Sequence, residues 1–179
     1  DGGVAYLYSA STMSVANSTR SFNIAYSDGG AFAADVESSL VCATCLLLNN
    51  SARASGGAMA LKGGARASTV SSQFRSNSAG ANGGAVSIVG LSDLALSGGG
   101  HEFVNNSCGS YGGALYMETA NNYGVLYRTS FRQNSVDVAG GAMAMAVSHC
   151  GKKKEKCEFI GNDVSSKAGT GGALWCVNL

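Results

Sequence analysis

The sequence repeats a pair of glycines followed by a small apolar residue at nearly constant spacing. Seven such pairs occur, and the intervals between them are 27, 27, 27, 29, 28 and 31 residues. The pairs begin at Gly2, Gly29, Gly56, Gly83, Gly112, Gly140 and Gly171. A fixed period of this length is typical of a solenoid, in which each repeat buries its apolar face against its neighbours. The pattern therefore constrains the fold strongly, although it contains no recurring reactive group.

A second marker runs in register with the glycine pairs. An asparagine stands six residues before five of the pairs and nine residues before the last, and an apolar residue usually stands three residues before that asparagine. The asparagines are Asn23, Asn50, Asn77, Asn106, Asn134 and Asn162, and the apolar position holds Phe74, Phe103, Phe131 and Phe159 in the later repeats. We expect hydrogen bonds from amide to amide along the asparagines and an internal column of phenylalanine rings. Both sets then hold the coils in register and carry no chemistry.

The residues after each glycine pair alternate between large apolar and smaller side chains, as at Met59 and Leu61 or at Val86 and Ile88. A period of two over a few residues predicts a half-buried strand. Proline is absent, which suits strands whose N–H groups all enter a ladder. We therefore predict an all-β fold, a right-handed parallel β-helix of about seven coils with repeats of ~27 residues. Residues 1–179 are expected to form a single domain that is a segment of a longer chain or of a fibre.

The two markers together resemble the repeat of a known family. The glycine pair followed by alanine and an apolar residue stands at Gly83–Val86 and Gly112–Leu115. The Phe-x-x-Asn element stands at Phe74–Asn77 and Phe103–Asn106. This combination resembles the repeats of chlamydial polymorphic outer-membrane proteins and of related extracellular β-helix proteins of microbial eukaryotes. The resemblance covers nearly the whole chain and implies a surface-displayed β-helix with an adhesive or structural role.

The cysteines favour structural disulfides. Cys42 and Cys45 have the spacing of a redox pair or of half a zinc site, but no second such pair exists and neither histidine lies at ligand spacing. Cys150 and Cys157 bracket a lysine-rich insertion, and a disulfide that closes this loop is the preferred pairing. The six cysteines are Cys42, Cys45, Cys108, Cys150, Cys157 and Cys176, and their other pairings remain open.

Three sequons for N-glycosylation begin at Asn17, Asn49 and Asn105. The last two occupy the same slot, one residue before a ladder asparagine, and we expect them to point to solvent two coils apart, roughly 10 Å from each other. Together with an even number of cysteines, the sequons predict covalent glycans and an extracellular or cell-surface location.

Composition and the placement of acidic residues argue against several functions. Only 13% of residues are charged and the formal net charge is +1, which argues against an electrostatic nucleic-acid partner, so we expect no nucleic acid. No apolar run approaches the ~18 residues of a membrane span, so no membrane insertion is expected. No two acids share a slot on the strand faces of neighbouring coils, and His101 is expected to lie at the surface after Gly98–Gly100. We therefore expect no catalysis, no cofactor and no metal.

These observations predict an extracellular structural protein, a β-helical subunit of a fibril or cell-surface appendage. Its partner would be another coil, either through self-association end to end or through flanking coils of the same chain. A surface adhesin or glycan-binding β-helix is the first alternative, because Tyr6, Tyr116 and Trp175 share one outward slot and could present flat rings to sugars. A carbohydrate-active β-helix enzyme is the second alternative.

Overall fold

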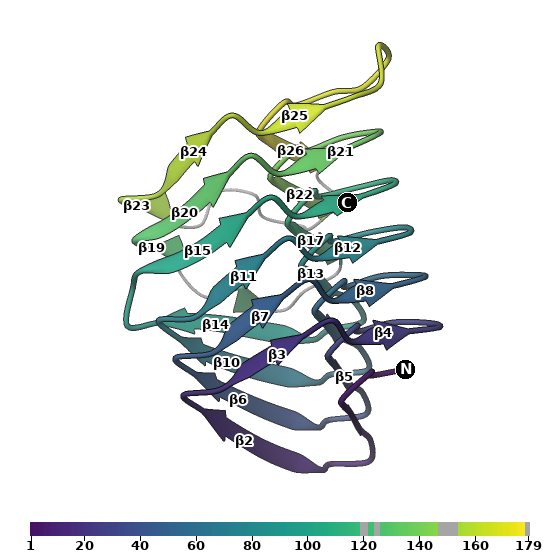
Figure 1. Cartoon of the computed structure of the whole chain (residues 1–179), viewed down its shortest axis with the longest axis vertical. Coiled ribbons are helices and arrows are strands. Elements are labelled where there is room, and N and C mark those ends of the chain that lie inside the picture. Colours follow the sequence, from purple (N-terminus) through teal and green to yellow (C-terminus); the bar gives the residue numbers. More distant parts are fainter. Residues whose placement is uncertain (119–121, 124–125, 147–153, 178–179) are drawn as a thin grey trace.

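The computed structural model describes residues 1–118, 122–123, 126–146 and 154–177. In this part of the chain the fold is all-β, with parallel strand pairs that build a solenoid of about six turns (Figure 1). Each of the first five turns contributes one strand to each of four sheets, which we name A to D in the order in which the chain visits them. The predicted β-helix with its ~27-residue repeat is confirmed.

Sheets A and B follow each glycine pair. Sheet A contains β1 (Ala5–Leu7), β5 (Phe32–Ala34), β9 (Met59–Leu61), β13 (Val86–Ile88), β17 (Leu115–Glu118), β22 (Met143–Ala146) and β26 (Leu174–Val177). Sheet B contains β2 (Thr12–Ala16), β6 (Ser39–Ala43), β10 (Arg66–Val70), β14 (Asp93–Ser97) and β18 (Asn122–Tyr123).

Sheets C and D complete each turn. Sheet C contains β3 (Thr19–Ser21), β7 (Leu46–Leu48), β11 (Gln73–Arg75), β15 (His101–Val104), β20 (Thr129–Arg132) and β24 (Glu158–Ile160). Sheet D contains β4 (Ile24–Ala25), β8 (Ser51–Ala52), β12 (Ser78–Ala79), β16 (Ser107–Cys108), β21 (Ser135–Val136) and β25 (Asp163–Val164). A small separate sheet pairs β19 (Leu126–Tyr127) with β23 (Lys154–Glu155).

The interior is filled by columns of identical or similar side chains, because each coil repeats the slots of the one before it. Phe74, Phe103, Phe131 and Phe159 stack nearly parallel, with ring centroids 4.6, 4.9 and 5.0 Å apart in succession. Offset stacking at these spacings is favourable for aromatic rings in a core. The phenylalanine column therefore lies where the repeat predicts it.

The asparagine ladder lies at the corner between sheets C and D. Asn77 is fully buried, and its Oδ1 accepts hydrogen bonds from the backbone N–H and the side-chain amide of Asn50, both at 3.0 Å. Its Nδ2 donates to the carbonyl oxygen of Leu47 at 2.9 Å and to Oδ1 of Asn106 at 3.0 Å. The same bonds recur from Asn23 to Asn162. Each amide thus satisfies main-chain groups that a sharp buried corner would otherwise leave unpaired.

The glycine pairs line up along one edge, and the two glycines have different reasons to be glycine. Gly83 has a φ of +62°, a conformation that other residues rarely adopt. A Cβ on Gly84 would lie 2.1 Å from the carbonyl oxygen of Gly113 in the next coil. The first glycine therefore makes the turn, and the second lets two coils approach.

Candidate functional site

The outer face of sheet A is the first candidate site, since the sequence places aromatic rings there. Strand pairing puts Tyr6, Tyr116 and Trp175 in one column, with only small residues between them. Tyr6 is 46% exposed, but Tyr116 is only 7% exposed and Trp175 is half-buried. The shared slot is therefore as predicted, while the prediction that it faces solvent is wrong for Tyr116.

A tyrosine outside the strands explains why Tyr116 is covered. Tyr111, just before a glycine pair, stacks on Tyr116 with ring centroids 6.2 Å apart and on Trp175 at 5.3 Å. The Tyr116 hydroxyl donates to Oε2 of Glu118 at 2.9 Å. Burial is the main reason that the pKa of Tyr116 is raised, and the nearby carboxylate of Glu118 raises it further. These rings face one another and tie coils together, so they form no open platform for a sugar.

The small residues of the same column are also covered. Ala33, Ala60, Ser87 and Ala144 are all buried, contrary to the flat exposed face that their outward slot predicts. Ala33 and Ala60 line a small pocket with the ion pair between Asp28 and Lys62. Burial alone would raise the pKa of Asp28, but hydrogen bonds from Lys62 and from the backbone N–H of Ser55 outweigh it and hold that pKa below its usual value.

A shallow groove at the corner between sheets B and C is the second candidate. It has a volume of about 220 Å³ and is lined by Gly100, His101, Glu102, Arg128, Thr129, Ser130, Lys156 and Glu158. Its two carboxylates form ion pairs outside the groove, Glu102 with Arg75 and Glu158 with Arg132. Within the described ranges, no three or more His, Cys, Asp or Glu side chains form a group that could hold a metal ion.

His101 lies in the wall of this corner and not at the surface, where the sequence placed it. Its side chain is fully buried. Strand pairing and position put it in a column with Ser18, Cys45, Ser72, Thr129 and Cys157, each directly before or at the start of a sheet C strand. This column was missed from the sequence, although a polar or sulfur-containing residue two positions before each stacked phenylalanine would have revealed it.

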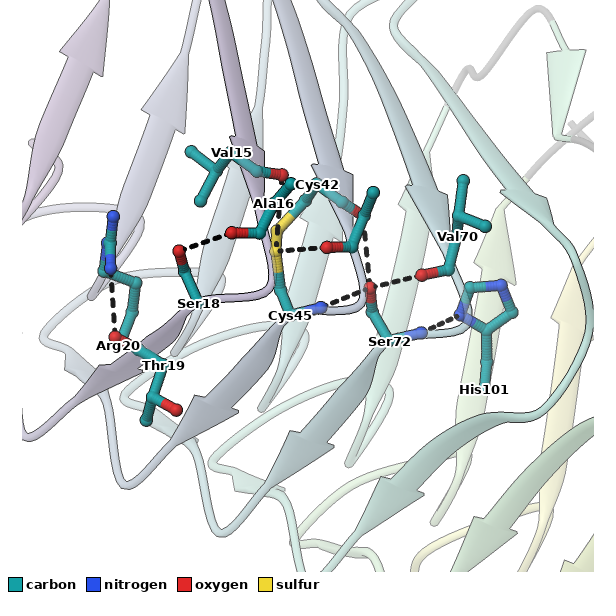
Figure 2. The surroundings of a disulfide bond; sticks show 11 residues. Val15, Ala16, Ser18, Thr19, Arg20, Cys42, Cys45, Val70, Ser72 and His101 are labelled. Carbon is teal, nitrogen blue, oxygen red and sulfur yellow. Dashed lines mark hydrogen bonds between the residues drawn. A yellow bond between two sulfur atoms is a disulfide. The ribbon is translucent and has the colours of Figure 1, made fainter.

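The disulfide of the chain's Cys-x-x-Cys element lies in the same corner (Figure 2). Cys42 in β6 and Cys45 just before β7 are joined with a Cα–Cα distance of 5.9 Å, and both are buried. Burial inside the solenoid favours the structural interpretation of this pair, because exchange with another thiol needs access to sulfur.

The predicted pairing of Cys150 with Cys157 is not what the structure has. Cys157 carries a thiol that packs against the core, and its Sγ donates to the carbonyl oxygen of Leu126 at 3.3 Å. The reason is its slot two residues before Phe159, which directs the side chain toward the core. Cys150 lies outside the described residues, and Cys176 takes part in a disulfide.

Cys108 is a buried thiol. Burial raises its pKa to about 11, so the thiolate is scarce near neutral pH and the residue is a poor nucleophile.

The three sequon asparagines lie at corners in left-handed backbone conformations. Asn17 and Asn105 are exposed, whereas Asn49 is half-buried, and their φ angles are 46°, 54° and 52° respectively. Asn49 and Asn105 occupy one slot two coils apart, with Ser76 between them, while the following residues Asn50 and Asn106 point inward and are fully buried. The shared slot is thus as predicted, Asn105 is exposed as expected, and Asn49 is less exposed than expected. Glycan occupancy stays a prediction.

We expect glycan occupancy to follow exposure when the chain passes through a glycosylating secretory pathway. Asn17 and Asn105 should carry glycans, and Asn49 should be occupied to a lower extent because a glycan there must fit beside its neighbours. Mass spectrometry of glycopeptides measures all three sites. An unmodified Asn105 would contradict the placement of this slot at the solvent.

No family model, curated protein or solved structure matches this chain. Among the described residues, no helix has the length and apolar character needed to cross a membrane.

Proposed function

We propose that this chain is an extracellular structural protein, a glycosylated and non-catalytic β-helical subunit of a fibril or cell-surface appendage. Support comes first from how the repeated side chains are used. The phenylalanines, the asparagines and the second glycines all act between one coil and the next. Contacts of this kind join each coil to its neighbours along one axis, so the coils form a rod. A rod is the shape that a structural subunit of a fibril needs.

The single observation that carries the proposal is the apolar surface of the first coil. Phe22, Ile24 and Tyr26 are 72%, 67% and 77% exposed. The column of Ile24 holds serine or aspartate in every later coil, beginning with Ser51. Large apolar groups that gather on one exposed coil indicate a contact with another protein surface.

The occupant that fits this coil best is another coil of the same kind. The first-coil strands β1, β2, β3 and β4 each stand at the end of the strand order of their sheet. An end strand presents main-chain groups that pair with a further strand, and four such strands at once match only a coil. The added coil belongs either to a second copy, stacked end to end, or to a flanking part of the same chain.

The proposed assembly is tested by replacing three exposed apolar residues of the first coil with the residues at the same positions of the second coil. The triple variant Phe22→Asn, Ile24→Ser, Tyr26→Arg introduces the residues found next in each column, namely Asn49, Ser51 and Arg53. We expect the wild-type chain to form rods several solenoids long in electron micrographs, and the variant to elute as a monomer in size-exclusion chromatography with light scattering. Loss of apolar contact area is the physical reason.

The matched control is Leu91→Glu, which removes an exposed apolar side chain from the middle of the solenoid. This variant should assemble as the wild type does. A wild-type chain that stays monomeric at high concentration would rule out the stacking of copies end to end, and would leave a flanking part of the same chain as the cover of the first coil.

The adhesin alternative has one observation in its favour. Tyr6 and Tyr8 are 46% and 55% exposed, and their ring centroids lie 6.0 Å apart. Two exposed rings on one strand edge can stack against a sugar. Binding to a glycan array that is lost in Tyr6→Ala, Tyr8→Ala would support this function for a monomeric chain.

A further inference from the structure

His101 makes two hydrogen bonds that fix its protonation state. Its Nδ1 lies 3.2 Å from the backbone nitrogen of Ser72 in the preceding coil (Figure 2). Its Nε2 lies 2.9 Å from the carbonyl oxygen of Ser97. A backbone N–H can only donate and a carbonyl oxygen can only accept, so the imidazole accepts at Nδ1 and donates at Nε2. Only the neutral ring does both.

The neighbouring coil performs the same task with a group that does not titrate. Oγ of Ser72 accepts the backbone N–H of Cys45 at 3.1 Å, as the imidazole accepts the N–H of Ser72. Oγ of Ser72 also donates to the carbonyl oxygen of Val70 at 2.9 Å. The third and fourth coils therefore each supply a side-chain acceptor at this corner. Of these two acceptors, only the imidazole binds a proton near neutral pH.

We propose that His101 is an acid-sensitive latch between the third and fourth coils, which opens when a proton on Nδ1 displaces the hydrogen bond from Ser72. The protonated ring would direct an N–H at the N–H of Ser72, so two donors would face each other. The backbone N–H of Ser72 would then be buried without an acceptor, which destabilises the folded state that holds the protonated ring.

The groups around the ring offer little compensation for a positive charge. Ser72, Ser97 and Thr129, which flank it, are uncharged at all relevant pH values. The acids of the adjoining groove, Glu102 and Glu158, already pair with Arg75 and Arg132. Two cationic residues complete the charged lining of that groove, namely Arg128 and Lys156.

The direction of the pH effect follows from these contacts. Burial lowers the pKa of His101 below its ordinary value of 6.5, and the hydrogen bond to the carbonyl oxygen of Ser97 only partly offsets this. The N–H that Ser72 donates to Nδ1 favours the neutral ring. The unfolded chain therefore binds more protons than the folded chain once the pH falls below 6.5. The latch contributes its full stability above that pH and loses it as the pH falls toward the lowered pKa. One such group changes the unfolding constant by up to about tenfold per pH unit.

The test compares the wild type with His101→Gln, whose neutral amide also offers an acceptor and a donor. Urea unfolding and hydrogen exchange of the Ser72 amide, corrected for the intrinsic pH dependence, are measured from about pH 7.5 to about pH 5. We expect the wild-type unfolding constant to rise more steeply toward acid than that of His101→Gln, by up to about tenfold per pH unit. Protection of the Ser72 amide should fall in parallel.

The control is His149→Gln, which removes the other histidine, a residue outside the described part of the chain. It should keep the wild-type pH profile. Parallel profiles for the wild type and His101→Gln would overturn the latch. If His101→Gln does not fold, nitrogen NMR of the wild-type ring decides: a neutral Nε2–H tautomer that persists below pH 6.5 supports the proposal, and an imidazolium formed at that pH refutes it.

Discussion

The alanine variant of Gly84 will not form a stable solenoid. A Cβ at this position would lie 2.1 Å from the carbonyl oxygen of Gly113, and 2.5 and 2.6 Å from the backbone oxygen and nitrogen of Ser107. All three atoms belong to the main chain of the next coil, so no side chain can move aside. Relief requires two stacked coils to separate, which breaks the hydrogen bond from Gly84 N to Gly112 O and its neighbours. We expect a loss of more than about 3 kcal/mol, against a typical total of 5–15 kcal/mol.

The control for crowding is Gly100→Asn. Gly100 has a φ of +71°, yet a Cβ there would meet nothing within 4 Å. Asparagine tolerates this conformation, and Asn17 and Ser71 adopt it in the equivalent slot of other coils, with φ angles of 46° and 43°. The variant should lose less than about 1 kcal/mol in urea unfolding followed by circular dichroism. Similar losses at Gly84 and Gly100 would show that crowding between coils is not the cause.

Much of the fold was predictable because stacking turns a sequence period into a physical repeat. Once each ~27-residue unit is one coil, equal slots must lie above one another, and Phe74 must stack on Phe103. The same logic places Asn106 inside and Asn105 outside, since neighbouring residues at a corner point in opposite directions. These inferences need no knowledge of what surrounds the coil.

His101 and Cys157 were misplaced from the sequence for one shared reason. Both follow apparent insertions, the glycines at 98–100 and the lysine-rich segment, and were therefore assigned to loops. In the structure each side chain stands two residues before a stacked phenylalanine, in the column that strand pairing defines. Counting back from Phe103 and Phe159, instead of forward from the previous repeat, places both inside.

The outer face of sheet A was misjudged for a different reason. Alternation distinguishes the two faces of a strand, but it does not show what covers the outer one. Tyr111 lies outside the predicted strands, and its ring reaches Tyr116 and, two coils further on, Trp175. Likewise Asp28 and Lys62 are 34 residues apart and meet only because the solenoid brings them together. Such contacts depend on three-dimensional stacking distances and side-chain directions that a period cannot supply.

The second large effect is expected at the asparagine ladder, in the variant Asn106→Ala. Oδ1 of Asn106 accepts from the N–H and the side-chain amide of Asn77, both at 3.0 Å, and its Nδ2 donates to Phe74 O at 2.9 Å and Asn134 Oδ1 at 3.0 Å. The site is fully buried, so water cannot replace these partners. Each buried group left unpaired costs about 1–3 kcal/mol, and we expect a total loss of about 3–6 kcal/mol in urea unfolding.

The adjacent residue Asn105 provides the control, measured on protein produced in a host that does not glycosylate it. Asn105→Gly alters an exposed side chain and suits the local φ of 54°, so it should cost less than about 1 kcal/mol of unfolding free energy.

A further variant, Asn106→Asp, separates hydrogen bonding from shape. An ionised carboxylate cannot donate to Phe74 O, whereas the protonated acid can, and burial raises the pKa of such a group. The folded state then binds more protons than the unfolded state, so this variant should regain stability as the pH falls. Equal losses for Asn106→Ala and Asn105→Gly would mean that packing of the phenylalanines, and not the ladder, holds these coils together.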